Sequence, residues 1–477
     1  MKRVIVIGGG ITGLATAHAL EKAKERLEVI LLEGSDRLGG NLVTVRHNAF
    51  TIDGGPDSWV ASKPHATRLA REVGLGDELI GTRPDTRKVY IVWQKKLHPM
   101  PEGLILGVPT EIKPFFDTDL LGFDAKLRAG LDLIVPPRHF QGDEDESIAS
   151  FVSRRLGHDV AERIVGPLLG GIFAGDPHSL SVRACVPQLV DAEAKHGSLI
   201  RAMRETSAKR KSEADGAVAP SAFLSLKRGM GDLVTNVAHK LRDAELRTSC
   251  PARSIGRTPD GQWAVQTSRD TIFADAVALT LPAHGAARLV DDLDDELASM
   301  LRAIEYVSTA TVFLAYKKFD VRNPLDAFGF LVPRAEGRPI LACTYVSSKW
   351  DHRAPSGQAL LRVFIGGAGN ERLLERDDEA LSRMAREQIL DLLGIDRPPM
   401  FAKVFRFDHG SPQPQVGHLA RMERMMARVA QWRGLYVGGN GYIGTGIPDA
   451  IKQGEDIAAR IMEACGTRPS SSAEATP

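Results

Sequence analysis

The sequence predicts an α/β protein whose central parallel sheet is assembled from segments that lie far apart in the chain. Three observations lead to this prediction. A β-branched strand, a glycine-rich turn and a helix open the chain as MKRVIVIGGGITGLATAHAL. A second buried strand, DAVALTLP, occupies 275–282, and a third, LYV at 435–437, precedes another glycine-rich turn and a final helix. Strands that alternate with helices in this way are typical of open α/β sheets.

The composition describes an ordinary globular protein of several domains. A length of 477 residues predicts about three domain-sized units. Lys and Arg total 61 against 60 for Asp and Glu, so the sequence lacks the basic excess of a nucleic-acid-binding protein. The four cysteines (185, 250, 343 and 465) are scattered, which argues against a disulfide framework or a zinc site. The apolar runs are too short for a transmembrane segment, whereas a peripheral membrane contact stays open.

The first twenty residues fit either an export signal or a nucleotide-binding turn. An export signal needs an unbroken apolar stretch after its basic residues. Here glycines interrupt that stretch directly after the strand at 3–7. The spacing Gly8-x-Gly10-x-x-Gly13, with a helix expected over 11–26 and a strand over 27–32, is the dinucleotide-binding fingerprint. We therefore expect the turn to hold a nucleotide and the protein to be cytoplasmic.

Each residue of this fingerprint has a physical reason. Gly8 permits the tight turn, Gly10 lets the backbone approach a pyrophosphate, and Gly13 lets the helix pack on the strand. The free N–H groups at the helix N-terminus attract the phosphates. Glu33 follows Gly13 by 20 residues, the distance expected for an acid that binds a ribose hydroxyl. The predicted cradle comprises Gly8, Gly9, Gly10, Ile11, Thr12, Gly13 and Glu33.

Further segments predict a second contact with a long anionic cofactor. Arg37-Leu38-Gly39-Gly40 supplies a cation and two glycines that a nicotinamide site does not need. DGGPDSW at 53–59 is a tight loop of the kind that passes against a flat ring. A simple β-turn is the plain alternative for the glycine pair. At the far end, GIPD at 446–449 predicts a helix with proline in its first turn. The dipole of that helix would favour negative charge on a reduced ring, although an ordinary capped helix fits the segment equally well.

Together these motifs resemble the FAD-dependent amine oxidase superfamily, and over nearly the whole chain they resemble its porphyrinogen oxidases. The resemblance rests on seven segments: GPDSW (55–59), LHPMPEG (97–103), ILGVPT (105–110), PLLGGIFAGDPHSLSV (167–182), HGSLI (196–200), PQPQVGH (412–418) and GIPDAI (446–451). LHPMPEG and ILGVPT are especially similar to the water-soluble enzymes of Gram-positive bacteria that oxidise coproporphyrinogen III to coproporphyrin III.

The resemblance implies an α/β architecture with a discontinuous Rossmann-like FAD-binding domain, a mixed-sheet substrate domain and a helical insertion. We expect the FAD-binding domain at 1–80, 226–294 and 408–465, the substrate domain at 81–110 and 295–407, and the helical domain at 111–207. The charged, aperiodic segment 208–222 predicts a flexible loop, and 466–477 predicts a disordered tail.

The residue patterns also predict individual elements inside these domains. Helices are expected at 126–135, 147–156, 159–169 and 183–195. Strands are expected at 245–247, 309–316, 327–332, 339–346 and 359–367, with a hairpin near 259–261. The acid run at 143–146 precedes the second helix and is interpreted as a partner for its N-terminal dipole, not as a metal site.

For the cofactor, the resemblance implies non-covalent FAD, since the loop at 438–449 contains no cysteine. A backbone contact with the adenine is expected at Ala252, and Phe407 is expected beside the flavin, where the family often has Trp. Pro414 replaces a usual aromatic residue. Besides the cradle, the expected FAD contacts are Arg37, Gly39, Gly40, Gly55, Pro56, Asp57, Ser58, Ala252, Phe407, Gly446, Ile447 and Pro448.

For the substrate, the resemblance implies a porphyrinogen whose six-electron oxidation returns electrons to molecular oxygen as hydrogen peroxide. No side chain is assigned as a catalytic acid or base, because flavin N5 would accept the hydride. Gly171, Ile172 and Phe173 are expected to line the cavity. Basic residues are expected at its rim, with Lys63 as the first candidate and Arg68 and Arg71 more simply read as solvated charges. The product would pass to a ferrochelatase in haem biosynthesis.

Other functions stay open at this point. Protoporphyrinogen IX is the alternative substrate, and the same fold hosts flavin amine oxidases, carotenoid desaturases and a sugar mutase. A non-catalytic FAD sensor is a further alternative. His196, His409 and His418 are more simply read as structural than as catalytic groups.

Overall fold

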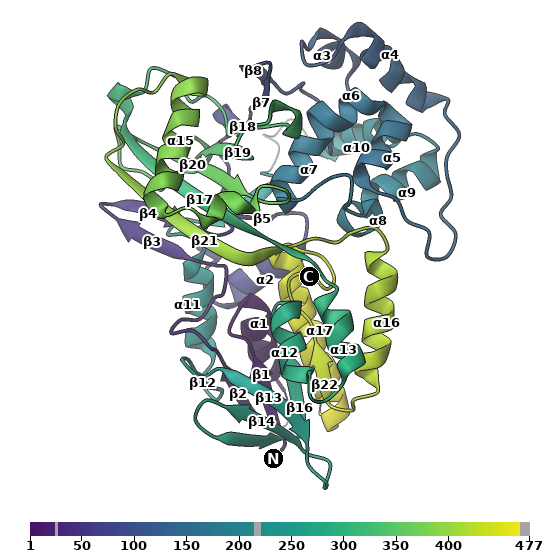
Figure 1. Ribbon diagram of the computed structural model, residues 1–477, viewed down its shortest axis with the longest axis vertical. Helices are drawn as coiled ribbons and strands as arrows, with labels where there is room; N and C mark the ends of the chain where they lie inside the picture. Colours follow the sequence, from purple (N-terminus) through teal and green to yellow (C-terminus); the bar gives the residue numbers. More distant parts are fainter. Residues whose placement is uncertain (24–26, 214–220, 468–477) are drawn as a thin grey trace.

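A five-stranded parallel sheet forms the base of the molecule (Figure 1). The computed structural model describes residues 1–23, 27–213 and 221–467. Every neighbouring pair of strands in this sheet is parallel. In spatial order the strands are β12 (Glu245–Arg247), β2 (Glu28–Leu32), β1 (Arg3–Ile7), β16 (Ala276–Leu279) and β22 (Leu435–Val437). The predicted assembly of one sheet from distant segments is therefore confirmed.

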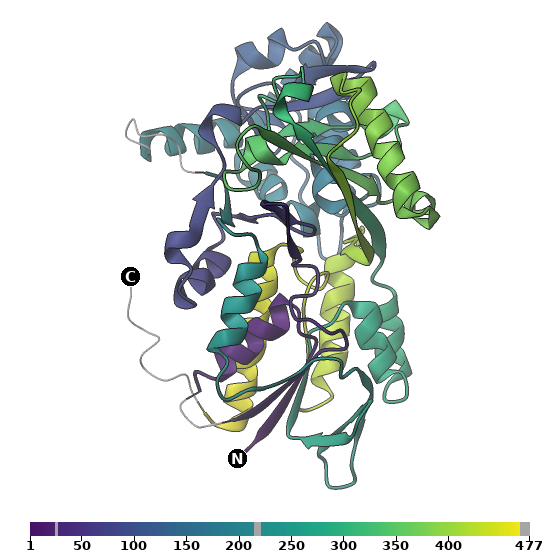
Figure 2. The ribbon, with the colours of Figure 1, turned by 90° about the vertical axis from the view of Figure 1, so that its left-hand side faces the viewer.

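Helices cover both faces of the parallel sheet (Figure 2). One core joins Val4 and Val6 of β1 to α1 (Ile11–Leu20), α11 (Gly231–Lys240) and α17 (Ile447–Cys465). Helices α1 and α17 pack so closely that a Cβ on Gly454 would lie 2.5 Å from the Thr12 carbonyl oxygen. The opposite core involves α12 (Ala283–Val290), α13 (Asp295–Arg302), α16 (His418–Ala430) and the sheet of β13 (Ala252–Arg257), β14 (Trp263–Thr267) and β15 (Thr271–Ala274).

A seven-stranded mixed sheet lies above this base, at the upper left of Figure 1. All of its strand pairs are antiparallel except β18 with β7. Helix α15 (Asp378–Leu393) packs on one face of the sheet. In spatial order the strands are β21 (Phe401–Pro412), β17 (Tyr306–Lys317), β20 (Gln358–Gly366), β19 (Ala342–Tyr345), β18 (Gly329–Leu331), β7 (Val89–Trp93) and β8 (Lys96–Pro99).

Short elements link the two sheets. The hairpin of β3 (Thr44–His47) and β4 (Phe50–Asp53) precedes a small sheet of β5 (Trp59–Val60), β11 (Phe223–Leu226) and β6 (Leu79–Gly81). Other short elements are α2 (Pro64–Glu72), β9 (Leu104–Ile105), β10 (Val108–Pro109) and α14 (Val346–Lys349).

The helical unit at the upper right of Figure 1 has its own core. It comprises α3 (Ile112–Asp117), α4 (Phe123–Gly130), α5 (Ile148–Leu156), α6 (His158–Val160), α7 (Gly166–Phe173), α8 (Val182–Cys185), α9 (Pro187–His196) and α10 (Leu199–Glu213). A charged cluster lies inside it: the fully buried Arg155 pairs with Asp132 and Glu193, and its Nε lies 2.6 Å from Asp132 Oδ1. The division into three domains remains a prediction.

Several predicted boundaries differ from the structure. The helix expected over 11–26 ends at Leu20, and the Glu21 carboxylate accepts hydrogen bonds from the backbone of 242–244. The helix expected over 183–195 is broken before Pro187, which cannot supply a helical N–H. The helix expected over 159–169 contains a π-helical turn, Ala161–Val165, and then continues to Phe173.

The loop expected over 208–222 is wrong in its first part, because α10 continues to Glu213. Residues 214–220 lie outside the described residues, as does the predicted tail beyond Thr467. The acid run is also used differently from the prediction. Glu146 pairs with Arg154, and Asp145 accepts a hydrogen bond from the Gly417 N–H, while Ser147 caps α5.

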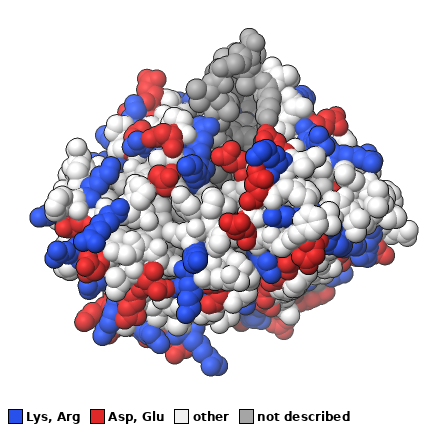
Figure 3. Space-filling model, turned by 90° about the horizontal axis from the view of Figure 1, so that it is seen from above, with Lys and Arg blue, Asp and Glu red and all other residues white. Residues whose placement is uncertain are grey.

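The surface shows mixed charge: on the face seen in Figure 3, Lys and Arg side chains interleave with Asp and Glu. Across the described ranges, no helix has the length and apolarity needed to span a bilayer. The same ranges contain no group of three or more His, Cys, Asp or Glu side chains placed to bind a metal.

We expect Arg155→Met to destabilise the protein by about 3–5 kcal/mol, because it leaves the buried carboxylate of Asp132 without its cation and leaves Glu193 with Arg154 alone. Chemical denaturation of the unfolding equilibrium measures this change. Lys452→Ala, which removes an exposed i,i+4 pair with Asp456, is the control and should cost less than about 1 kcal/mol. Equal effects of the two substitutions would contradict this account of the helical core.

Candidate functional site

The two glycine turns predicted to hold the cofactor lie side by side. Gly39 donates its N–H to the Gly9 carbonyl at 2.8 Å, and Gly10 and Gly39 form an isolated parallel bridge. Gly39 and Gly40 both have positive φ, which explains why glycines are used there. Segments separated by about 30 residues of sequence thus form one continuous backbone surface at the N-terminus of α1.

The glycines of the first turn have different environments. A Cβ on Gly13 would lie 1.9 Å from the Gly8 carbonyl oxygen, so the close packing of helix on turn excludes any side chain. A Cβ on Gly10 would meet no atom within 4 Å. The protein therefore needs glycine at 13 for its own packing, whereas the space at Gly10 is open for a ligand. This open cradle at a helix N-terminus fits the pyrophosphate of a dinucleotide.

Glu33 lies at the C-terminal end of β2, as its spacing predicts. Its Oε2 accepts a hydrogen bond from the Gly9 N–H at 2.7 Å, and its Oε1 accepts two from Ser35. The carboxylate thus braces the glycine turn, while its contact with a ribose remains a prediction. Ala252 lies nearby at the start of β13, because the preceding Cys250 donates its N–H to the Glu33 carbonyl at 2.9 Å.

Arg37 is placed beside the turn but is used locally. Its guanidinium donates to the carbonyl oxygens of Gly40, at 2.7 Å, and of Leu38 and Leu42. These bonds hold the turn in shape, so the contact of Arg37 with a pyrophosphate stays a prediction.

The loop at 54–58 joins the two sheets. A Cβ on Gly55 would lie 1.8 Å from the Asn41 carbonyl oxygen and 3.6 Å from Cζ of Phe407, so the glycine turn, the loop and β21 meet here. The side chain of Asp57 points to Lys349 and Trp350, at 3.1 and 3.0 Å. Burial alone would raise the pKa of the Asp57 carboxyl, but Lys349, Arg362 and the Trp350 hydrogen bond together hold it well below its usual range.

Helix α17 contacts β5, the strand that follows this loop. Gly446 is its N-cap, and Ile447 and Pro448 open its first turn. Asp449 Oδ2 accepts the Gly446 N–H at 3.3 Å, and both carboxylate oxygens of Asp449 lie 2.7 Å from Nζ of Lys63. Lys63 is thus brought to the predicted cofactor side, where it forms an ion pair with α17.

The other two candidate cations, Arg68 and Arg71, lie on α2. Arg68 pairs with Glu455 of α17, and its guanidinium is half-exposed. Arg71 is exposed on the same helix, α2.

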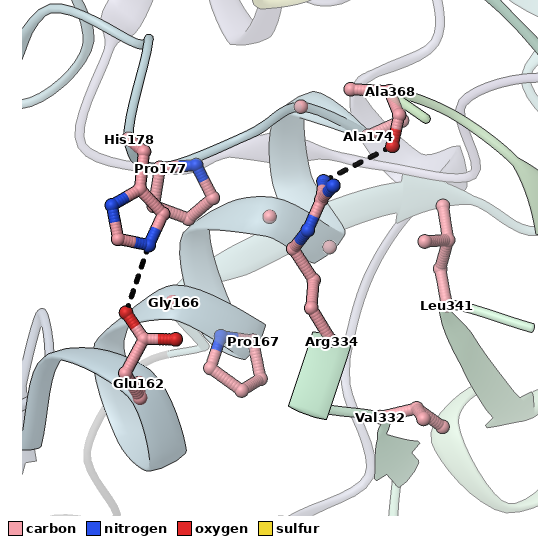
Figure 4. A pocket seen from close by; sticks show the side chains of 13 residues that line it. Glu162, Gly166, Pro167, Ala174, Pro177, His178, Val332, Arg334, Leu341 and Ala368 are labelled. Carbon is pink, nitrogen blue, oxygen red and sulfur yellow. Dashed lines mark hydrogen bonds and ion pairs between the residues drawn. The ribbon is translucent and has the colours of Figure 1, made fainter. Parts of the chain in front are cut away.

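Helix α7 contributes the predicted substrate residues from the other side. Ile172 is 63% exposed and Phe173 is buried, with the Phe173 carbonyl accepting a hydrogen bond from Gln413 Nε2 at 3.0 Å. Gly171 is one of the α7 residues that line a pocket, whose other side is formed by Val332, Arg334, Leu341 and Ala368. Figure 4 shows this pocket. Glu162 pairs with His178 on one side of this pocket, and Arg334 binds the Ala368 carbonyl on the other.

Sequence reasoning missed the face of the mixed sheet that looks toward the loop at 54–58. Cross-strand partners share a face of a sheet. Thr309 lies opposite Phe407, Thr311 opposite Phe364 and Phe405, and Phe313 opposite Arg362. The alternation in LLRVFIG was the available signal, because Arg362 and Phe364 project from the same side of one strand.

The three histidines singled out in the sequence have separate roles. His418 is buried, its Nε2 lies 2.9 Å from the Tyr442 carbonyl oxygen, and burial lowers the pKa of its imidazole. His196 pairs with Glu205. His409 is exposed, and its ring lies 5.7 Å from that of His284.

The comparison with known families decides which cofactor this geometry serves. The model of flavin containing amine oxidoreductases matches residues 11–462. The chain belongs to this family. It is therefore a flavin-dependent oxidoreductase of the α/β class, and the open cradle at Gly10 fits the dinucleotide part of a flavin cofactor.

The similar proteins include both coproporphyrinogen III oxidases and protoporphyrinogen oxidases. The chain is 34% identical to coproporphyrinogen III oxidase of Bacillus subtilis (strain 168), over 95% of this chain and 96% of that protein. It is 29% identical to the chloroplastic protoporphyrinogen oxidase 1 of Spinacia oleracea, over 96% of this chain and 84% of the relative. A crystal structure from Exiguobacterium sp. 255-15, described provisionally as a protoporphyrinogen oxidase, has a TM-score of 0.84 at 33% identity and covers 96% and 98% of the two chains.

We expect Gly10→Ala to weaken flavin binding at least tenfold while the unfolding of the apoprotein changes by less than about 1 kcal/mol. The reason is that the new methyl group meets only the space left for the ligand. Flavin titration and denaturation of the apoprotein measure the two effects. Gly13→Ala is the matched comparison and should destabilise the apoprotein itself, because its Cβ overlaps the Gly8 carbonyl. Unchanged flavin affinity in Gly10→Ala would contradict the cradle.

Proposed function

We propose that the protein is an FAD-dependent oxidase that converts coproporphyrinogen III to coproporphyrin III in haem biosynthesis. The reaction removes six electrons from each porphyrinogen and transfers them to oxygen, which becomes hydrogen peroxide. The observation that supports this proposal most directly is the match to the B. subtilis coproporphyrinogen III oxidase, which extends over 95% of this chain and 96% of the relative. The product would pass in the cytoplasm to a ferrochelatase.

We propose that FAD binds without a covalent bond, through the residues expected from the sequence. The bound flavin supplies the acceptor for hydride from the substrate. The chain supplies position: the turns at 8–13 and 37–40 hold the pyrophosphate, Glu33 faces the ribose, and Phe407 and the loop at 54–58 lie toward the ring. Cys250 and Cys343 are buried, and the four cysteines all lie outside 438–449.

The substrate would lie between α7 and the inner face of the mixed sheet. Gly171 lets α7 pack closely on the sheet, since a Cβ on it would lie only 3.3 Å from the Leu331 side chain, so the substrate would lie beside this contact. The exposed Ile172 offers an apolar surface of the kind that packs against a flat macrocycle. Gln413 fixes the end of α7 through the Phe173 carbonyl. No carboxylic acid or imidazole is required to move a proton in this arrangement.

We retain Lys63 as the proposed contact for a substrate propionate, although the structure shows that it already has a carboxylate partner. Its ammonium group already pairs with Asp449, so a propionate would have to compete with that carboxylate or share the cation with it. This competition makes the contribution of Lys63 measurable as a change in KM.

The experiment compares initial rates on freshly reduced coproporphyrinogen III and protoporphyrinogen IX, followed by porphyrin fluorescence and peroxide. We expect a clear preference for the four-carboxylate substrate. In Lys63→Ala that preference should fall several-fold through KM, with kcat nearly unchanged, because a lost exposed ion pair is worth about 1 kcal/mol. Lys452→Ala on α17 is the control.

The outcomes separate the alternatives. Equal rates, or faster turnover of protoporphyrinogen IX, would assign the protein to the activity named for the spinach relative. Turnover of neither substrate by the FAD-loaded protein would favour an amine oxidase or a sensor. If Lys63→Ala kept the preference for coproporphyrinogen III, Lys63 would be a solvated surface charge that does not contact the substrate.

We expect acid or heat denaturation to release all of the flavin into the supernatant as FAD, because no thiol lies in the loop at 438–449. Absorbance of the supernatant and of the washed precipitate measures the release. Yellow colour retained in the precipitate would show a covalent bond.

A further inference from the structure

A cluster of charged side chains holds the loop at 53–57, and the function proposed above assigns no role to it. Asp53 and Arg353 are buried and pair at 3.1 Å. Asp57 pairs with Lys349 at 3.1 Å. The third cation, Arg362, is 6% exposed and forms no ion pair within 4 Å with any carboxylate of the described residues. Two carboxylates thus face three cations.

Arg362 is fixed by contacts that do not cancel its charge. Its Nη2 donates to the Gly54 carbonyl at 2.9 Å, and its guanidinium lies over the rings of Phe313 and Phe364, at 5.5 and 4.5 Å. Its Nε is buried without a hydrogen-bond partner. Burial lowers the pKa of the guanidinium, while Asp57 and Asp53 raise it less. Arginine nevertheless keeps its proton in proteins, so the charge remains.

Asp53 does not supply the missing negative charge. Burial raises the pKa of the Asp53 carboxyl, and this outweighs the opposing effects of Arg353, Thr44 and the Met230 N–H. Any protonation of Asp53 would increase the excess of positive charge. An uncompensated buried charge is expensive, and such groups persist where another charge appears during function.

The position of Arg362 indicates that this additional negative charge develops near Gly54 and Phe407. The carbonyl that it binds belongs to Gly54, the residue before Gly55, which lies against Phe407. Phe407 and Arg362 project from the same face of the mixed sheet. Phe407 and Gly55 are the residues that we expect beside the flavin ring. A flavin gains negative charge on reduction, and fixed positive charge in a water-poor site stabilises such a change.

We propose that Arg362 is a positioning residue that holds the Gly54 carbonyl and whose uncompensated buried charge makes the protein bind reduced FAD more tightly than oxidised FAD. The proposal rests on the FAD placement given above and not on the identity of the porphyrinogen. Thr311 provides a natural control within the same contact, because its Oγ1 donates to the same Gly54 oxygen at 3.0 Å and carries no charge.

The test measures the midpoint potential of the FAD-loaded protein under anaerobic conditions, together with its affinity for oxidised FAD. In Arg362→Met, we expect the ratio of affinities for reduced over oxidised FAD to fall at least tenfold, which is about 30 mV for a two-electron couple. Arg362→Lys keeps the charge and should stay within threefold of the unaltered protein. Thr311→Val loses a donor without losing charge and should also stay within threefold.

If Arg362→Met does not fold, Asp57→Asn provides a second test of the proposal. Removing this carboxylate increases the excess of positive charge and should raise the same ratio by about tenfold. The proposal is overturned if Arg362→Met leaves the ratio within threefold, if Thr311→Val lowers it as much as Arg362→Met does, or if Asp57→Asn leaves it unchanged. Failure of the unaltered protein to bind FAD would instead overturn the proposed function.

Discussion

The close approach of backbone to backbone at the first turn is the constraint on which the rest of the structure depends. Gly13 packs directly on the Gly8 carbonyl, and Thr280 Oγ1 lies within hydrogen-bond distance of the carbonyls of Ile7 and Gly8, at 3.0 and 2.9 Å. This contact joins the first strand and helix to a strand that arrives about 270 residues later. The N-terminus of α1 therefore points at a fixed place only after distant parts of the chain have come together.

The two sheets are joined by a second, charged contact. Asp53 lies at the end of β4 and accepts hydrogen bonds from Thr44 and from the Met230 N–H, while Arg353 reaches it from the segment before β20. Arg353 also donates to Ser225 and to the Leu226 carbonyl. Because breaking such a network leaves buried charges unpaired, the sheets cannot shift independently without a large penalty. The β3–β4 hairpin, the N-terminal end of α11, β11 and the segment before β20 are thereby held in one geometry.

The sequence allowed the parallel sheet, its glycine turn and the position of Glu33 to be predicted because each depends on local pattern. Strand β1 is a continuous β-branched run, and Gly8-x-Gly10-x-x-Gly13 has one structural use in that context. The breaks in the helical unit were not predictable in the same way. The π-helical turn Ala161–Val165 and the continuation of α7 from Gly166 through Pro167 to Phe173 follow no spacing that the sequence displays.

The partners of charged side chains could not be predicted from the sequence either. Arg37 was predicted from its charge to bind a pyrophosphate and Lys63 to bind a propionate, and Asp57 was predicted from its place in a tight loop. The structure shows that each side chain bonds to the protein itself. Arg362, which forms no ion pair with a carboxylate of the described residues, stands in the sequence as one polar residue in an apolar strand. A charged side chain becomes informative once its partners are known, because its availability depends on whether the fold has already neutralised it. The cation that stays uncompensated in a buried place is the one on which new negative charge has the largest effect.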